Sequence, residues 1–396
     1  MQASALPSFD YDAPLQRVIF EPHATSRIAD AVRSLGARRA LVVCGAHTRK
    51  TRLLATIVDL LGELCVGVFD RVVEHSATTV VTEGAAQARE HAIDVLVAVG
   101  GGSASDTAKG IAILLAEGGR LEAHASRFTP PDQFFPMPLP NPKLPIIAVP
   151  TTASAAEVTP GLGIRDPMTG AKLLFWDVKL ASRVIILDAE ANLEVPAALM
   201  ATTAMNGFAH CAEGLYSRRR NPISEALALQ GARILTRAIP AMIAAPAEAA
   251  HRAAVLIGAN LSGMVISNAR VGIHHAVCHC LGALGGLSHG VANAIMLPHA
   301  LAYNLDVAAT ELRGLAQAMG VRVDGMSAEA AAQAAIDAVR ELQIASAVPR
   351  RLRDTGIDRS LLPKIAEHTL RDRGLYFNPK RTGSTEPIVA LLEQAW

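Results

Sequence analysis

The chain has 396 residues, 51% of them apolar, and its 37 Lys and Arg nearly balance its 36 Asp and Glu, giving a formal net charge of +1. This length allows a large core divided between two domains, and the near-neutral balance provides no basic surface for nucleic acid or an acidic membrane. No run approaches the roughly 18 uninterrupted apolar residues of a membrane span. The start, MQASALPSFDYDAPLQ, lacks the pattern of a secretory signal. We therefore expect a cytoplasmic protein without nucleic-acid or membrane partners.

The first half of the chain alternates short apolar runs with amphipathic segments. After an apolar segment at Arg17–Phe20, strands are predicted at Ala40–Cys44, Cys65–Phe69, Val95–Val99, Ile146–Val149 and Val184–Leu187, and helices at Thr25–Leu35, Arg52–Leu61 and Val80–His91. This order, with short connections, predicts a parallel sheet with helices on both faces. The stretch Phe128–Pro145 carries seven prolines and is predicted to be a surface connection without helix or strand.

A glycine triplet ends the strand Val95–Val99 and opens a helix. Gly100, Gly101 and Gly102 would let the backbone approach a diphosphate, although a tight strand-to-helix turn explains them equally well. Asp106 and Lys109 follow on the first two turns of this helix and favour a polar ligand site. Thr151 and Thr152 end another strand at the same sheet edge, so dinucleotide binding is the favoured interpretation.

After Asp188 the chain becomes rich in Ala and Leu with a helical periodicity. Helices are predicted at Ala197–Ser217, Ser224–Ala238, Ala247–Ser267, His274–Leu284, Thr310–Met319, Ala328–Leu342, Leu361–Leu370 and Pro387–Trp396. We therefore predict an N-terminal α/β domain at residues 1–190, an all-α domain at residues 191–396, and a cleft between them.

Histidines concentrate in one stretch of the helical half, Val271–His299, which holds five of the thirteen. His275 and His279 are four residues apart, as are Asn206 and His210, so the members of each pair can share a helix face. His289 follows a Gly-Gly break that lets the chain turn back. We expect these side chains to converge on one reacting centre.

The five cysteines, Cys44, Cys65, Cys211, Cys278 and Cys280, show no disulfide-framework spacing, which favours a reducing compartment. Cys278 and Cys280 flank His279 and suit zinc by residue type. Their alternation on a helix puts them on other faces, so buried small residues are the favoured interpretation.

Several segments resemble the iron-containing alcohol dehydrogenase family over nearly the whole chain. They are GGGSASDTAK, PTTASAAEVTP, DPMTGAK, MNGFAHCAEGLYS and HHAVCHCLGALGGLSHGVANAIMLPH. The resemblance implies a dehydroquinate synthase-like fold, with an NAD(P)-binding α/β domain and a helical metal-binding domain. It implies a cofactor site formed by Gly100, Gly101, Gly102, Ser103, Asp106, Thr151, Thr152 and Lys172. It also implies metal-ligand positions at Asn206, His210, His275 and His289, and a catalytic role for His279.

Three departures bear on which branch of the family the chain resembles. Typical metal-dependent members carry an Asp where this chain has Asn206, and an amide brings no charge, so affinity for Fe²⁺ or Zn²⁺ should fall. The threonine loop is one residue shorter than usual. Both features, and the C-terminal segment, resemble the maleylacetate reductase subfamily, whereas Asp106 and VANAIMLPH resemble general alcohol dehydrogenases. The first strand of the α/β domain ends in Cys44-Gly45 without a carboxylate, so NADH or NADPH would be accepted.

The expected function is hydride transfer from NAD(P)H to a small oxo acid, with reduction of maleylacetate to 3-oxoadipate as the leading candidate. The alternative is an iron- or zinc-dependent alcohol dehydrogenase acting on a small alcohol, aldehyde or hydroxy acid. An enzyme of the same fold acting on a sugar phosphate would need a basic cluster that only Arg218–Arg220 offers. That run and Lys172 are candidates for binding substrate carboxylates, with solvated surface the favoured interpretation of the run.

For the remaining polar residues of these segments we expect structural roles. His274 and His299 are interpreted as structural histidines, Tyr216 as core packing and Glu213 as a charge on a helix surface. We further expect a homodimer.

Overall fold

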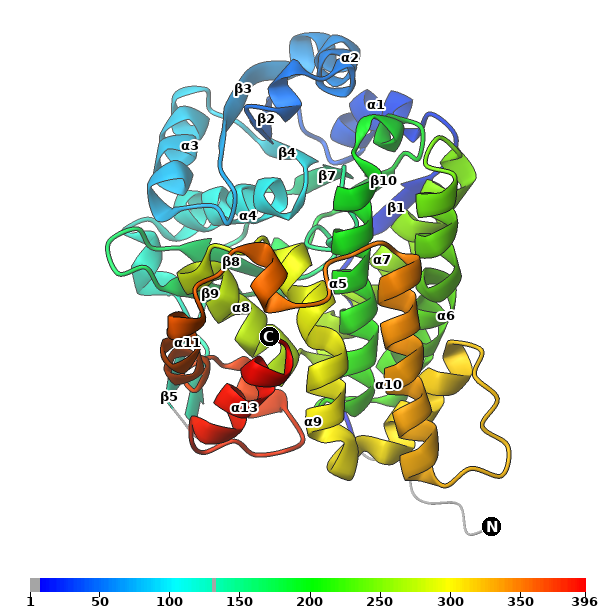
Figure 1. Ribbon diagram of the computed structural model, residues 1–396. Helices are drawn as coiled ribbons and strands as arrows, with labels where there is room; N and C mark the ends of the chain where they lie inside the picture. The colour runs from blue at the N-terminus through cyan, green and yellow to red at the C-terminus, as the bar shows by residue number, and fades with distance from the viewer. Residues whose placement is uncertain (1–7, 130–132) are drawn as a thin grey trace.

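A six-stranded parallel sheet forms the centre of the N-terminal half in the computed structural model, which describes residues 8–129 and 133–396 (Figure 1). The spatial order is β1-β10-β7-β4-β2-β3. The strands are β1 (Arg17–Phe20), β2 (Ala40–Gly45), β3 (Cys65–Val72), β4 (Val95–Gly100), β7 (Ile146–Pro150) and β10 (Val184–Leu187). The predicted parallel sheet is confirmed. Because β4 and β7 are neighbours, with Gly100 opposite Pro150, the glycine triplet and the threonines lie side by side at one edge.

Helices cover both faces of this sheet. Alternate residues of β2 belong to different cores: Val42 packs with α1 (Ile28–Ser34) and α2 (Arg52–Leu61), whereas Leu41 and Val43 pack with α3 (Thr78–Glu90) and α4 (Gly102–Glu117). The predicted coverage of both faces is therefore confirmed. It explains why the strands read as continuous apolar runs, since neither face meets water.

Two antiparallel hairpins lie outside the sheet, β5 (Arg127–Thr129) with β6 (Gln133–Phe135), and β8 (Gly161–Arg165) with β9 (Lys172–Trp176). The prediction that Phe128–Pro145 contains no strand is wrong for its described part; residues 130–132 lie outside the described residues. β6 ends before Pro136, so pairing requires no proline N–H at that point. The β8–β9 hairpin was not predicted, and it carries Lys172.

The C-terminal half is helical. Its helices are α5 (Ala197–Tyr216), α6 (Pro222–Ala244), α7 (Ala249–Ala269), α8 (Ile273–Gly285), α9 (His289–Ala318), α10 (Ala328–Ala345), α11 (Leu362–Thr369), α12 (Gly374–Phe377) and α13 (Glu386–Gln394). The separate helix predicted at Thr310–Met319 is instead the end of α9. This helix contains Pro298 and is kinked at Ala308, where φ is −131°, and these interruptions hid its length in the sequence pattern.

Within the described residues, α7 is long and apolar enough to cross a membrane when judged by length and composition alone. It packs against α5 and α6 in the helical half. Its Arg252 is buried and donates hydrogen bonds to the carbonyls of Asn192 and Val195, as expected of a helix in a protein core.

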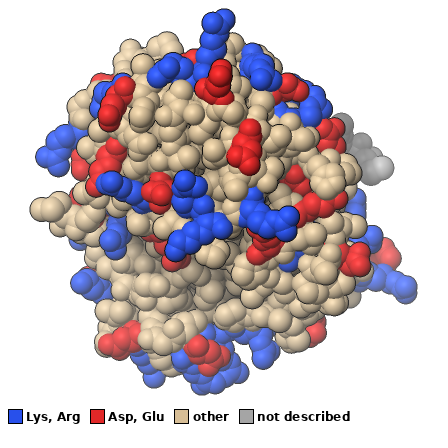
Figure 2. All heavy atoms as spheres, turned by 90° about the horizontal axis from the view of Figure 1, so that it is seen from above, with Lys and Arg blue, Asp and Glu red and all other residues tan. Residues whose placement is uncertain are grey.

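The chain passes from the sheet to the helices over a short segment. β10 ends at Leu187, a 3-10 turn covers Ala191–Glu194, and α5 begins at Ala197. Figure 1 shows the sheet and its helices in the upper part of the view, with α5 to α10 extending below. Basic and acidic side chains are interspersed on the face seen in Figure 2.

Candidate active site

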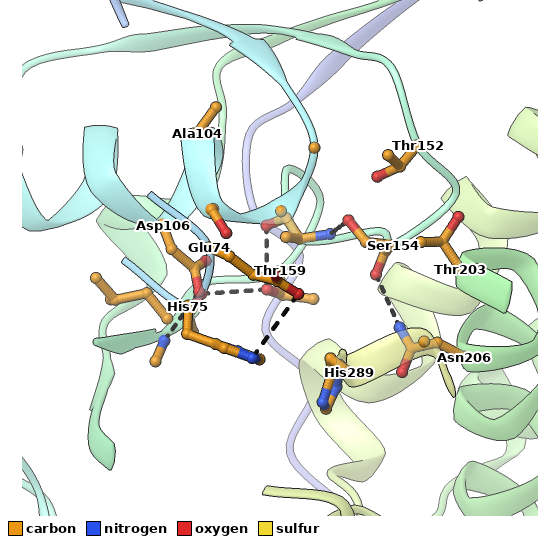
Figure 3. A pocket seen from close by; sticks show the side chains of 18 of the residues that line it. Glu74, His75, Ala104, Asp106, Thr152, Ser154, Thr159, Thr203, Asn206 and His289 are labelled. Atoms are coloured by element: carbon orange, nitrogen blue, oxygen red, sulfur yellow. Dashed lines mark hydrogen bonds and ion pairs between the residues drawn. The ribbon is translucent and has the colours of Figure 1, made fainter. Parts of the chain in front are cut away.

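A cavity of about 920 Å³ is lined by residues of both halves of the chain. The glycine triplet and the threonine loop contribute from the α/β half, and α5, α8 and α9 contribute from the helical half. Figure 3 shows Asp106 on one side of this cavity and Asn206 and His289 on the other. Every predicted cofactor, metal and catalytic residue lines it.

The glycine triplet lies directly against the threonine loop. A Cβ on Gly101 would lie 3.1 Å from Cγ2 of Thr152, and one on Gly102 would lie 3.1 Å from Oγ of Ser154. Gly100 has φ +144°, a conformation that other residues rarely adopt, and its carbonyl accepts a 2.9 Å hydrogen bond from the Thr151 N–H. The tight turn is therefore real, and it also opens the N-terminus of α4 onto the cavity, where the helix dipole favours an anion.

Asp106 and Lys172 approach each other across β8. One Asp106 oxygen accepts a 3.1 Å hydrogen bond from the Gly163 N–H, while Oδ1 is buried without a partner among the described residues. Burial raises the pKa of Asp106, and the charges of Lys109 and Lys172 oppose that rise. A Cβ on Gly163 would collide with Cε of Lys172, so this glycine makes room for the lysine.

Lys109 does not face the ligand site, in contrast to the prediction. Its buried ammonium donates hydrogen bonds to the carbonyls of Ala156 at 2.5 Å, Thr159 at 2.6 Å and Gly161 at 2.9 Å. Burial lowers the pKa of Lys109 to about 8. Lys109 therefore holds the loop between β7 and β8 and the first residue of β8, and Lys172, not Lys109, lines the cavity.

The structure brings the predicted histidines together. The ring centroids of His210 and His275 are 4.9 Å apart, and His289 lies 5.6 Å from both His275 and His279. Asn206 joins them, because its Oδ1 lies 3.0 Å from Nε2 of His275 while its Nδ2 donates to the Ser154 carbonyl. Five side chains separated by up to 83 positions, 206 to 289, thus lie next to one another.

Hydrogen bonds fix the orientation of three of the imidazoles. Ser262 donates to the Ala259 carbonyl and so accepts from Nδ1 of His210. A carboxylate accepts from Nδ1 in the other two, Glu213 for His275 and Asp372, at 2.8 Å, for His279. His210 and His279 therefore carry an Nε2 lone pair that is free, as in histidines oriented for catalysis or metal binding, whereas Nε2 of His275 faces the Asn206 oxygen at 3.0 Å.

The imidazole nitrogens and the Asn206 oxygen are atoms that can bind a divalent metal ion, but none of them carries a negative charge. Burial lowers the pKa values of His210 and His289 well below the usual range and that of His275 to about 4, so all three are neutral near pH 7. Neutral imidazoles suit Fe²⁺ and Zn²⁺, and the Asn206 oxygen lies next to them. These residues fit such an ion, but the set lacks an anionic ligand to strengthen the binding.

Glu213 is buried, so the prediction of a helix-surface charge is wrong. Its Oε1 accepts hydrogen bonds from the backbone N–H groups of Gly272 and His274. Burial by itself raises the pKa of Glu213, but His275 and His274 outweigh it and lower that pKa. Glu213, His274 and His275 are close enough to resemble a metal site. Because backbone donors occupy Glu213, we interpret it as the group that orients His275.

Two of the predicted cationic candidates, Lys172 and Arg219, line the cavity. Arg218 donates to the Tyr376 carbonyl and Arg220 pairs with Glu311, and of the run only Arg219 lines the cavity. Arg270 and Arg373 also line the cavity, although no motif in the sequence indicated them.

Cys278 and Cys280 are buried free thiols, as predicted, and the hydroxyl-bearing Tyr216 is buried in the core. His274 is also buried, with Nε2 3.0 Å from the Asn293 carbonyl. These four buried side chains do not line the cavity and belong to the protein interior.

Comparison with known proteins decides the family. Residues 15–189 match the model for iron-containing alcohol dehydrogenase, and residues 200–396 match the C-terminal model of the Fe-containing alcohol dehydrogenase family. The chain belongs to the iron-containing alcohol dehydrogenase family. The predicted membership is confirmed, and with it the predicted two-domain fold.

Relatives within the iron-containing alcohol dehydrogenase family act on different substrates. The chain is 34% identical to 1,3-propanediol dehydrogenase of Klebsiella pneumoniae, covering 98% of this chain and 99% of the relative. It is 33% identical to maleylacetate reductase 2 of Cupriavidus pinatubonensis, covering 96% and 94%. A crystal structure of 1,3-propanediol oxidoreductase superimposes with a TM-score of 0.92 at 33% identity, covering 98% and 100%. The chain is accordingly an NAD(P)-dependent oxidoreductase acting on CH–OH or CH–CH groups, as predicted.

Proposed function

We propose that this enzyme transfers a hydride from NADH or NADPH to a small oxo acid, reducing maleylacetate to 3-oxoadipate in the degradation of aromatic compounds. The observation that carries the proposal is the amide of Asn206, which faces His275 where metal-dependent members of the family place a carboxylate. A neutral donor set weakens metal binding and leaves the imidazoles available for proton transfer.

The cofactor is proposed to bind along the edge of the sheet formed by β4 and β7. Gly100, Gly101, Gly102 and Ser103 would bind the diphosphate at the N-terminus of α4, and Asp106, Thr151, Thr152 and Lys172 would line the nicotinamide side. Gly45 and His47, after β2, also line the cavity, and no carboxylate stands at these positions to repel a 2′-phosphate. We therefore propose that both NADH and NADPH are accepted.

The proposed chemistry places His279 as the catalytic residue. Hydride from nicotinamide C4 adds to the carbon–carbon double bond conjugated with the ketone, and negative charge develops on the ketone oxygen. Completion of the reduction needs a proton: His279 would take one up from solvent at Nε2 and pass it to the enolate, while Asp372 accepts the Nδ1–H at 2.8 Å and stabilises the transient imidazolium. The nearby charge of Lys172 acts on both His279 and His289 and favours an oxyanion there.

The alternative function is a metal-dependent alcohol dehydrogenase. It is favoured by Nε2 of His210 and by Nε2 of His275, which lies 3.0 Å from the Asn206 oxygen. Together with His289, these groups would hold Fe²⁺ or Zn²⁺. Such an ion, when bound, polarises a carbonyl as a Lewis acid. The two functions differ in metal content, so we expect purified enzyme with little Fe or Zn and full activity after treatment with a chelator. Near-stoichiometric metal, with activity abolished by the chelator, would establish the alternative.

The substitution His279→Ala tests the catalytic assignment. We expect kcat for maleylacetate reduction to fall by roughly 10²- to 10⁴-fold, the usual contribution of a general acid, while the dissociation constant of NADH stays unchanged. His299→Ala is the matched control, since His299 does not line the cavity. Unchanged kcat in His279→Ala would remove this residue from the mechanism.

The cellular setting is proposed from the surface and the thiols. All five cysteines are free, which suits the reducing cytoplasm.

We propose a homodimer, because β1 is an edge strand and such edges favour pairing. Leu15, just before β1, is 75% exposed, and Phe20, its last residue, is 48% exposed. A mass of twice 41.6 kDa by light scattering is expected, and a monomer would contradict it. We propose no nucleic-acid or membrane partner, in line with the formal net charge of +1.

A further inference from the structure

Two half-buried arginines line the cavity. Arg270 ends α7 and Arg373 precedes α12. Burial lowers the pKa of Arg270 to about 9 and that of Arg373 to about 10, and the charge of Arg373 also depresses the pKa of Arg270. Both guanidinium groups therefore stay protonated near pH 7 although they repel each other and are partly desolvated.

Arg270 is held in a strained conformation with an unused donor. Its φ of +68° is rare for a residue with a side chain. The guanidinium carbon lies 3.3 Å from the centroid of the Trp176 ring, which fixes the plane of the group. Nη1 is buried and finds no hydrogen-bond partner within the described chain. The negative charge of Asp12 raises the pKa of Arg270, but among the described residues these two side chains form no ion pair.

Arg373 stands beside the proposed catalytic histidine. It follows Asp372, whose two oxygens accept hydrogen bonds from His279 and from the Gly374 N–H. Asp372 is thus engaged elsewhere, and in the described residues Arg373 forms no ion pair. The charge of Arg373 also acts on His279, so the arginine lies near the ring that faces the reacting carbonyl.

Two repelling, desolvated guanidinium groups are stabilised when an anion binds between them. A guanidinium presents a planar fork that matches the two oxygens of a carboxylate, whereas a neutral alcohol or aldehyde would leave both charges uncompensated. We propose that Arg270 and Arg373 form a binding site for a carboxylate group of the substrate, which selects an oxo acid over a neutral aldehyde. This inference rests on the proposed function, because it assigns the residues that bind the acid group of the proposed substrate.

The test compares Arg270→Gln and Arg373→Gln with wild type in two measurements. In each variant, KM for maleylacetate should rise by roughly 10- to 100-fold while KM for NADH stays unchanged. Calorimetric titration with adipate, a six-carbon dicarboxylate without a reducible group, in the presence of NAD⁺ should show a dissociation constant raised by a similar factor. Arg220→Gln is the matched control, because it removes the same charge from a side chain that does not line the cavity.

The outcomes separate this inference from the proposed function. Unchanged adipate affinity and unchanged KM for maleylacetate in both folded variants would overturn the carboxylate site. A raised KM for NADH or NADPH with unchanged adipate affinity would assign the arginines to a cofactor phosphate and also overturn it. If wild type binds adipate through these arginines but does not reduce maleylacetate, the carboxylate site stands and the proposed function fails. Should Arg270→Gln fail to fold, Arg270→Lys keeps the charge, loses the planar fork, and is expected to weaken adipate binding less strongly.

Discussion

Asn206 differs from an aspartate in charge but hardly in size, which makes it a direct test of metal affinity. Its Oδ1 lies 3.0 Å from Nε2 of His275, so a carboxylate would occupy the same place. We expect Asn206→Asp to raise the affinity for Zn²⁺ or Fe²⁺ by roughly tenfold or more, because an anionic ligand would join the neutral imidazoles. The measurement is the dissociation constant of the metal by competition with a chromogenic chelator.

Asn192→Asp is unsuitable as a control for that change, because Asn192 bonds Arg252. Gln317→Glu adds the same charge at an exposed position of α9 outside the cavity and should leave the affinity unchanged. If Asn206→Asp binds metal no better than wild type, the missing charge is not what limits metal binding.

Helical spacing found the site residues that share an element. Asn206 and His210 face the cavity from α5, and His275 and His279 face it from α8, as their four-residue spacing indicates. Glu213 comes three residues after His210 and lies on the same side of α5, so its spacing also indicated that it belongs near the site. No such spacing indicated Asp372, Arg270 or Arg373. Only tertiary packing brings the end of α7 and the segment before α12 to the cavity.

The loop between β7 and β8 depends on Lys109 of α4. Three backbone carbonyls of this loop accept hydrogen bonds from the lysine ammonium, and the side chain is fully buried. We expect Lys109→Met to lower the free energy of unfolding by about 3 kcal/mol, because the acceptors would stay buried without a donor. Chemical denaturation measures it.

Lys364→Met replaces an exposed lysine of α11 and serves as the control, with no change in stability expected. A Lys109→Met protein as stable as wild type would show that other donors or water can satisfy the three carbonyls.

The main sheet was predictable at the level of whole elements because its strands are buried on both faces and its helices are regularly amphipathic. The hairpins were not: β6 is three residues long, and β8 has glycines at Gly161 and Gly163 that lower its strand signal. Those glycines are needed because Trp176 and Lys172 occupy the space beside them. Only the last part of α9 was predicted, as Thr310–Met319, because Pro298 interrupts the helical pattern before it, although the packed helix tolerates this proline.

The stability of the whole protein should depend on pH through Glu157. Burial raises the pKa of this carboxyl from 4.5 to about 7, and the charge of Lys109 opposes the rise. Below the unfolded pKa of 4.5 the group is protonated in both states and costs nothing. As pH rises from 4.5 to about 7 the group ionises in the unfolded chain but stays protonated in the fold, which destabilises the native state, and above pH 7 the cost is constant. From the two pKa values, this cost grows by about 2–3 kcal/mol between pH 5 and pH 8.

The substitution Glu157→Gln removes this ionisation and isolates its effect. Other carboxylates, such as Glu213 and Asp372, have lowered pKa values and stabilise the fold increasingly as pH rises, but they do so equally in both proteins. We therefore expect the stability of Glu157→Gln relative to wild type to increase from pH 5 to pH 8 in parallel denaturation curves. Glu341→Gln, at an exposed position of α10, should show a constant difference. A difference that is equally constant for Glu157→Gln would mean that Glu157 keeps its ordinary pKa because Lys109 compensates its charge fully.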